Sequence, residues 1–171
     1  AVTSLGEGAW SEELTVASVT SLYPGAPREL AVTAVASRSF GVGWRMVDDP
    51  QSENVLRYVL EVTGGRNATT TFITLSHTDC IVPGNGPCYA TIDQTAFAEL
   101  ETNTTYTLGL RALNVYGASV ASQVTSVTTL AGVPDLVGSP AVSSVMQTSM
   151  AVSWIAPASN GDPLVMYRVW T

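Results

Sequence analysis

The stretch YTLGLRALNVYGAS, Tyr106–Ser119, decides the fold class of this 171-residue chain. Its first part places tyrosine, leucine, leucine and alanine at every second position, with threonine, glycine and arginine between them. Alternation with period two is typical of a β-strand that has one buried face and one solvated face. The residues NVYG then indicate a hairpin turn, in which Gly117 supplies positive φ.

The same alternation recurs along the chain, for example in RSFGVGWRM around Trp44. Proline and glycine clusters separate the alternating runs at YPGAP, PGNGP, GVPD and NGDP, and each cluster indicates a turn or linker. No segment predicts a helix. Short strands bounded by turns predict an all-β sandwich.

The chain also repeats itself. SRSFGVGW matches QTSMAVSW, which puts Trp154 110 residues after Trp44. LRYVLEV matches VMYRVWT with Tyr58 over Tyr167, a shift of 109, and GAPREL matches GVPDLV at a shift of 107. The opening AVTSLGEGAWS resembles the end of the first quoted stretch at a shift of 111. A nearly constant period predicts tandem copies of one domain.

Three units follow from this period. We expect residues 1–22 to be the C-terminal strands of a first copy, 23–131 a complete copy, and 132–171 the N-terminal strands of a third. Half-copies would expose apolar faces and open strand edges, so we expect the chain to be a stretch of a longer polypeptide.

These spaced residues resemble the fibronectin type III module. PREL and PDLV resemble its first strand, Trp44 and Trp154 its second-strand tryptophan, and Tyr58 and Tyr167 its third-strand tyrosine. LETNTTYTLGLRALNVYG resembles the run of leucine, turn, tyrosine and strand that follows in the family. The resemblance implies tandem immunoglobulin-like β-sandwiches. Only Gly64–Cys88 is longer than a simple crossing between the two sheets requires.

Six residues are expected to build the cores rather than a site. Tryptophan on an inward strand position buries a large apolar area between sheets. Tyr106 follows Leu100 by six residues and resembles the tyrosine corner, in which the hydroxyl bonds to upstream backbone. The expected structural core residues are Trp44, Tyr58, Leu100, Tyr106, Trp154 and Tyr167.

Composition excludes several classes of function. The net charge is −7, with seven arginines and no lysine, and the arginines form no cluster. We therefore expect no binding to nucleic acid or to an anionic membrane surface. No apolar run approaches the roughly 20 residues of a membrane helix, so we expect no direct membrane insertion.

Cys80 and Cys88 flank IVPGNGP and are the only cysteines. Their spacing favours a disulfide that closes a nine-residue loop, and disulfides persist outside the cytosol. Two alternatives stay open at this point. The thiols could be unrelated and buried, or they could bind a metal together with His77, although three ligands leave a structural zinc site incomplete.

Two N-glycosylation sequons occur, Asn67-Ala68-Thr69 and Asn103-Thr104-Thr105, both in polar, turn-like surroundings. Together with the cysteine pair they predict passage through the secretory pathway and an extracellular or cell-surface location. Of the two, Asn67 is the better candidate, since Asn103 has an ordinary role in forming its turn.

No residue pattern predicts catalysis, a cofactor or a metal. His77 is the only histidine, and no G-x-S-x-G elbow or complete glycine fingerprint is present. Asp48 and Asp49 are adjacent carboxylates, but a calcium site needs further oxygen ligands. Arg-Gly-Asp is absent, so the integrin-binding loop of some family members is not indicated.

The sequence therefore predicts a non-catalytic structural or adhesive segment of a larger protein, in which tandem modules form a semi-rigid rod. Its partners would be the neighbouring modules of the chain and other proteins or glycans at the cell surface, in a matrix, or in a filament or appendage. Two other interpretations remain: accessory spacer modules of a secreted polysaccharide-acting enzyme, and an intracellular cytoskeletal or ciliary scaffold. Free thiols and bare asparagines would favour the last.

Overall fold

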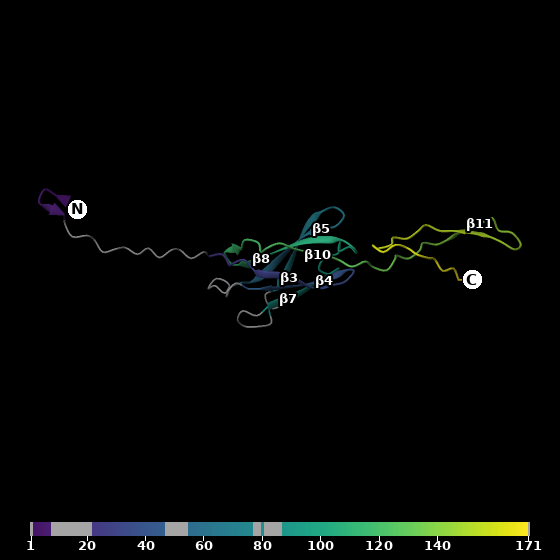
Figure 1. The fold of residues 1–171 in the computed structure, drawn as a ribbon, viewed down its shortest axis with the longest axis horizontal. Coiled ribbons are helices and arrows are strands. Elements are labelled where there is room, and N and C mark those ends of the chain that lie inside the picture. The colour runs from purple at the N-terminus through teal and green to yellow at the C-terminus, as the bar shows by residue number, and fades with distance from the viewer. Residues whose placement is uncertain (1, 8–21, 47–54, 77–79, 81–86, 171) are drawn as a thin grey trace.

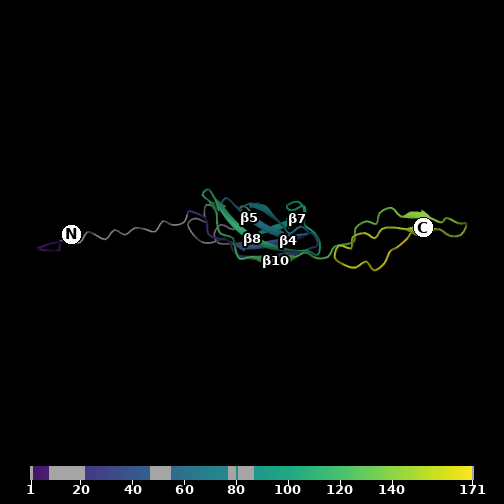
Figure 2. The same cartoon turned by 90° about the horizontal axis from the view of Figure 1, so that it is seen from above.

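The computed structural model describes residues 2–7, 22–46, 55–76, 80 and 87–170. Its centre is a sandwich of two antiparallel sheets (Figure 1, and turned by 90° in Figure 2). One sheet has the order β3-β4-β7, and the other has the order β10-β8-β5-β6, with β9 paired to β8. The described residues contain strands, turns and bends but no helix, so the predicted all-β class is confirmed.

The strands are short, as expected for a sandwich. The first sheet consists of β3 (Arg28–Val35), β4 (Ser39–Arg45) and β7 (Pro87–Asp93). The second consists of β5 (Arg57–Gly64), β6 (Thr69–Ser76), β8 (Thr105–Asn114), β9 (Gly117–Ala118) and β10 (Thr125–Thr128). Outside the sandwich lie two hairpins, β1 (Val2–Thr3) with β2 (Gly6–Glu7), and β11 (Ala141–Ser143) with β12 (Ala151–Ser153).

The core follows the alternation in the sequence. Every second residue of β5 and of β8 is buried, and the intervening side chains are mostly half-buried or exposed. The strand β4 differs, because Gly41 and Gly43 are buried together with their apolar neighbours. The side chains of Thr33 and Tyr89 cover Gly43 within 3.1 Å of the position that its Cβ would take. At Gly41 and Gly43 the outer face of this sheet is therefore covered by neighbouring side chains, where the sequence predicted solvent.

Tyr106 closes the end of the sandwich as the tyrosine-corner resemblance implies. Its side chain has no exposed surface, and its hydroxyl accepts a hydrogen bond from the backbone N–H of Glu101 at 2.8 Å. The ring of Phe97 meets the Tyr106 ring edge-on at 5.7 Å. Burial raises the pKa of the Tyr106 hydroxyl above its ordinary value.

Two serine hydroxyls complete the outer edge of β8 between β9 and β10. Ser119 Oγ accepts from the N–H of Ala112, and Ser122 Oγ accepts from the N–H of Leu110, both at 3.0 Å. The backbone N–H groups of the same serines donate back to those two residues at 2.8 Å. A buried N–H without a partner is costly, so these serines replace ladder bonds that a regular strand would make.

The two hairpins outside the sandwich reproduce pairings found inside it. In β3 and β4, Val32 lies opposite Val42, and in β11 and β12 the partners are Val142 and Val152. In β8 and β9, Asn114 lies opposite Gly117, and the hairpin of β1 and β2 pairs Thr3 with Gly6. Gly6 and Gly117 both have positive φ, at 129° and 142°. These residue pairs occur at the sequence shifts of 110 and 111.

Trp154 and Tyr167 are not core residues in this chain, which corrects the expectation for these two positions. Their exposed fractions are 36% and 40%, whereas Trp44 and Tyr58 are each 1% exposed. The ring pairs are otherwise alike, with centroids 5.1 Å apart in the exposed pair and 5.2 Å apart in the buried pair. No second sheet covers β12 among the described residues, which leaves the apolar face open to solvent.

Within the described part of the chain, no helix is long and apolar enough to span a membrane.

Candidate functional site: the cysteine pair, the sequons and the junction groove

Cys80 and Cys88 are joined by a disulfide bond in the structure. Cys88 is fully buried on β7 directly opposite Trp44 of β4, and Cys80 is half-buried against the same core. The bond therefore ties Cys80 to β7 at the position directly opposite Trp44. His77 lies outside the described residues, so the alternative metal site is not placed. Among the residues that are described, no three histidine, cysteine, aspartate or glutamate side chains gather as metal ligands would.

Asn67 lies in the turn 65–68 that joins β5 to β6. It is exposed, and the following Ala68 has a φ of 47°, in the left-handed region. The turn is fixed to the sandwich by Arg66, whose guanidinium pairs with Glu101 at 3.1 Å and whose backbone N–H donates to the same carboxylate at 3.2 Å. Asn67 thus projects beside an ordered turn, with solvent around its side chain.

Asn103 occupies a different place, in the turn of the tyrosine corner. Its φ is 47°, and its backbone N–H donates to the carbonyl of Leu130 at 3.0 Å. Thr104 on the same turn receives support from Thr129, whose hydroxyl accepts from the Thr104 N–H at 3.0 Å. The side chain of Asn103 is exposed but faces Gly161, which belongs to the segment after β12.

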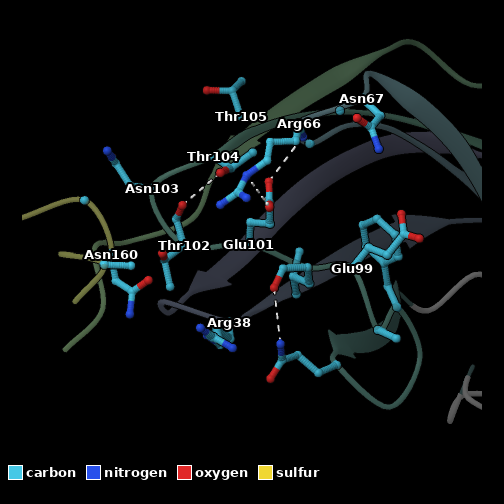
Figure 3. Close-up of a pocket in the computed structure, with 18 of the residues that line it drawn as sticks. Arg38, Arg66, Asn67, Glu99, Glu101, Thr102, Asn103, Thr104, Thr105 and Asn160 are labelled. Carbon is cyan, nitrogen blue, oxygen red and sulfur yellow. Dashed lines mark hydrogen bonds and ion pairs between the residues drawn. The ribbon is translucent and has the colours of Figure 1, made fainter. Parts of the chain in front are cut away.

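A groove of about 920 Å³ lies at this end of the sandwich, and we call it the junction groove. Figure 3 shows polar side chains converging on it, with Asn160 on a separate segment from the sandwich turns. Its walls are the β5–β6 turn, the segment 94–105 that carries the tyrosine corner, Arg38, Asp135, and the turn 158–161.

The segment after the sandwich is held to itself and to the sandwich by a set of hydrogen bonds that we call the Asn160 clasp. The Asn160 side-chain amide donates to the carbonyl of Val133 at 2.7 Å and to the carboxylate of Asp135 at 2.9 Å. The Asn160 carbonyl accepts from Gly132 N–H at 2.8 Å. Two residues earlier, Leu130 donates to the carbonyl of Ala36 in the sandwich at 3.0 Å. The linker is thus hydrogen-bonded to the sandwich at Leu130 and to the turn 158–161 at Gly132.

The junction groove is lined mainly by polar residues. Its lining has hydroxyls, amides, carboxylates and guanidiniums, and it has no histidine or cysteine. The carboxylate of Glu101 is already engaged by Arg66. The groove can offer hydrogen bonds to a polar partner or to the neighbouring segment of the chain.

Sequence reasoning missed the clasp. The run NGDP was identified only as a turn, and nothing local to Gly132 indicates a close approach of backbone. The repeat assigns NGDP to the third copy, after the Trp154 strand, but it carries no sign that this turn folds back onto the linker. Asp48 and Asp49, considered as calcium ligands, lie outside the described residues.

Comparison with known proteins gives one family. The model of the fibronectin type III domain matches residues 25–128, which covers all the strands of the sandwich. No curated protein matches the chain. Similar solved structures are the third fibronectin III domain of the human KIAA0343 protein, the FN5 domain of Drosophila Lar, and the twitchin kinase region of C. elegans.

The likeness to these structures concerns the fold alone. The KIAA0343 domain is 18% identical with a TM-score of 0.50, over 71% of this chain and 95% of that one. For Lar the identity is 18% and the TM-score 0.46, over 64% of this chain and 99% of that one. For twitchin the values are 16% and 0.49, over 63% of this chain but only 17% of that one. The match over residues 25–128, together with the two-sheet sandwich, shows that this chain belongs to the fibronectin type III family.

Proposed function

We propose that the chain is a non-catalytic spacer and interaction element, built as a tandem array of fibronectin type III repeats and operating outside the cytosol. Domains of this family are commonly structural or interaction modules in larger proteins, so the general class follows from the family. The array, the adhesive role and the extracellular location are the further claims proposed here.

One observation supports the proposal that the chain is a tandem array. The β11–β12 hairpin repeats the β3–β4 pairing, and the β1–β2 hairpin repeats the β8–β9 pairing, each at the period of the sequence. The Trp154–Tyr167 ring pair repeats Trp44–Tyr58 in distance and in edge-on geometry. Copies of one fold connected by short linkers act as spacers, since each copy adds a fixed length to the chain. Residues 1–22, 23–131 and 132–171 are the units that we assign.

The linkers support restrained spacing. The linker that leaves β10 reaches Pro134 within a few residues, and proline limits the conformations of the chain around it. The hydrogen bonds of Leu130 and Gly132 restrain the same stretch from both sides. A flexible tether would have neither feature.

The disulfide and the sequons support the location. The Cys80–Cys88 bond is stable in an oxidising compartment, where the exposed Asn67 would also meet the glycosylation machinery. We assign proteins or glycans of the cell surface or matrix as partners, together with neighbouring modules of the same chain.

Small-angle X-ray scattering tests the spacer. We expect the chain to give one well-defined maximum dimension. Insertion of a Gly-Ser stretch between Ala131 and Gly132 should broaden the distance distribution and lengthen its tail. Identical distributions for the two proteins would mean that the native linker restrains nothing, and the spacer function would then be rejected.

A further inference from the structure

We propose that Asn103 is a glycan-controlled latch for the joint between the sandwich and the segment that follows it. Bare Asn103 packs against Gly161 and closes the joint, whereas an N-linked glycan on its Nδ2 holds the joint open. The inference rests on the proposed function, because the sugar can be added only on a secretory route. It makes the two sequons unequal: Asn103 touches Gly161 and sets the state of the joint, whereas Asn67 lines the same groove and makes no contact with Gly161.

The first observation is that the backbone of the following segment approaches the tyrosine-corner turn without intervening space. A Cβ atom built on Gly161 would meet the Asn103 side chain, with Cγ at 2.8 Å and Nδ2 at 3.0 Å. A Cβ atom on Gly132 would lie 2.9 Å from Thr102 Cγ2. Carbon atoms in good contact are about 3.5–4.0 Å apart, so neither position has space for even one methyl group. A sugar ring on Asn103 is much larger than a methyl group.

The second observation is that the Asn103 amide is available for modification. The side-chain amides of Asn114 and Asn160 each donate to a backbone carbonyl, at 2.8 Å and 2.7 Å. Asn103 Nδ2 has no hydrogen-bond partner among the described residues, and the side chain is exposed. The contact with Gly161 therefore holds the Asn103 side chain in the joint. A substituent on Nδ2 would remove that contact directly.

The order of synthesis makes modification possible before the contact forms. Asn103 precedes Gly161 by 58 residues, so it leaves the ribosome first. In the transfer, Nδ2 gives up one hydrogen and bonds to C1 of N-acetylglucosamine from a lipid-linked oligosaccharide. The lipid pyrophosphate is the leaving group, and the proton passes to the transferase. The turn 158–161 then meets an asparagine that already carries its sugar, so the Asn103–Gly161 contact does not form and the joint stays open.

The chain supplies its own matched control. Thr69→Ala removes the Asn67 sequon and leaves Asn103 as the only acceptor, and Thr105→Ala does the reverse. Neither substitution changes an asparagine side chain. Both proteins would be made with isotope labels in a glycosylating eukaryotic host and trimmed to a single N-acetylglucosamine. The readout is the nuclear Overhauser effect between the Asn103 Hβ and Gly161 Hα protons, with chain made in bacteria as the unglycosylated reference.

We expect the cross-peak in the unglycosylated chain and in the chain glycosylated at Asn67, and its loss in the chain glycosylated at Asn103. Retention of the peak with sugar on Asn103, or its absence from the unglycosylated chain, would overturn the latch. A secreted, disulfide-bonded chain with sugar on Asn67 and none on Asn103 would also overturn it, while the proposed function would stand. Free thiols and two bare sequons in the native protein would instead remove the proposed function.

Discussion

The joint between the sandwich and the following segment gives the sharpest test of the structure, through the substitution Gly132→Ala. The φ of Gly132 is not in the left-handed region, so alanine adds no backbone strain there, and its effect is purely steric. The new methyl group would lie 2.9 Å from Thr102 Cγ2, well inside the usual carbon–carbon contact distance. Overpacking costs about 1–3 kcal/mol in a well-packed core, and at the half-buried Thr102 we expect the lower end of that range.

That cost should fall on the joint and not on the sandwich. Gly132 lies beyond β10 and outside the hydrophobic core, so moving the linker away relieves the clash while the sheets stay folded. A cost of about 1–3 kcal/mol corresponds to a roughly 5- to 150-fold increase in the ratio of open to closed joints. We therefore expect the Asn103–Gly161 cross-peak to weaken in proportion to the loss of closed joints, with the thermal unfolding midpoint of the sandwich unchanged.

Two further variants make this prediction specific. Gly138→Ala adds the same methyl group where no atom lies within 4 Å, so it should leave the joint closed. Thr102→Ser removes the Cγ2 atom that the new methyl group strikes, and in the Gly132→Ala background it should restore the cross-peak. An undiminished cross-peak in Gly132→Ala, or a loss of equal size in Gly138→Ala, would refute the reasoning.

Three other predictions concern the sandwich itself. Tyr106→Phe should lower the free energy of unfolding by about 1–3 kcal/mol in urea titrations. The substitution removes the hydroxyl that accepts a hydrogen bond from the Glu101 backbone N–H, and this N–H then has no partner. The exposed control Tyr116→Phe should change it by less than about 0.5 kcal/mol, and equal effects would contradict the tyrosine-corner role. The disulfide closes a nine-residue loop, so replacing Cys80 and Cys88 by alanine should cost at least about 2–3 kcal/mol by loop entropy, measured by the same titration, and no loss would argue against the bond. Hydrogen bonds from the hydroxyl and N–H of Thr95 lower the pKa of Asp93 below 3.8, so its stabilising contribution is present above that value and is lost as the pH falls through the folded-state pKa. Asp93→Asn should therefore flatten the dependence of stability on pH below 3.8, and an unchanged slope would contradict this assignment.

The sandwich was predictable from the sequence because its determinants are local and periodic. The alternation in the run from Tyr106 to Ala112 fixes which side chains enter the core, and the spacing of Leu100 and Tyr106 fixes the corner. The disulfide pairing was also accessible, since two cysteines that bracket a turn leave only one internal partner.

The junction could not be predicted in the same way. It depends on the distance between two backbones that are far apart in sequence, and single-chain patterns carry no such distances. Gly161 was identified only as part of a turn, and its contact with Asn103 requires both segments to be placed in space. The fate of Trp154 was foreseeable in part: the repeat marked it as a core position, and the lack of a covering sheet among the described residues leaves it exposed.

Peptide-level mass spectrometry of the native protein, without reduction and then after it, tests the central claim most directly. The account predicts a Cys80–Cys88 cross-link before reduction and sugar on Asn67, the signature of a spacer that has passed through a secretory route. Free thiols at both cysteines together with bare Asn67 and Asn103 would contradict it and would place these repeats in a reducing compartment.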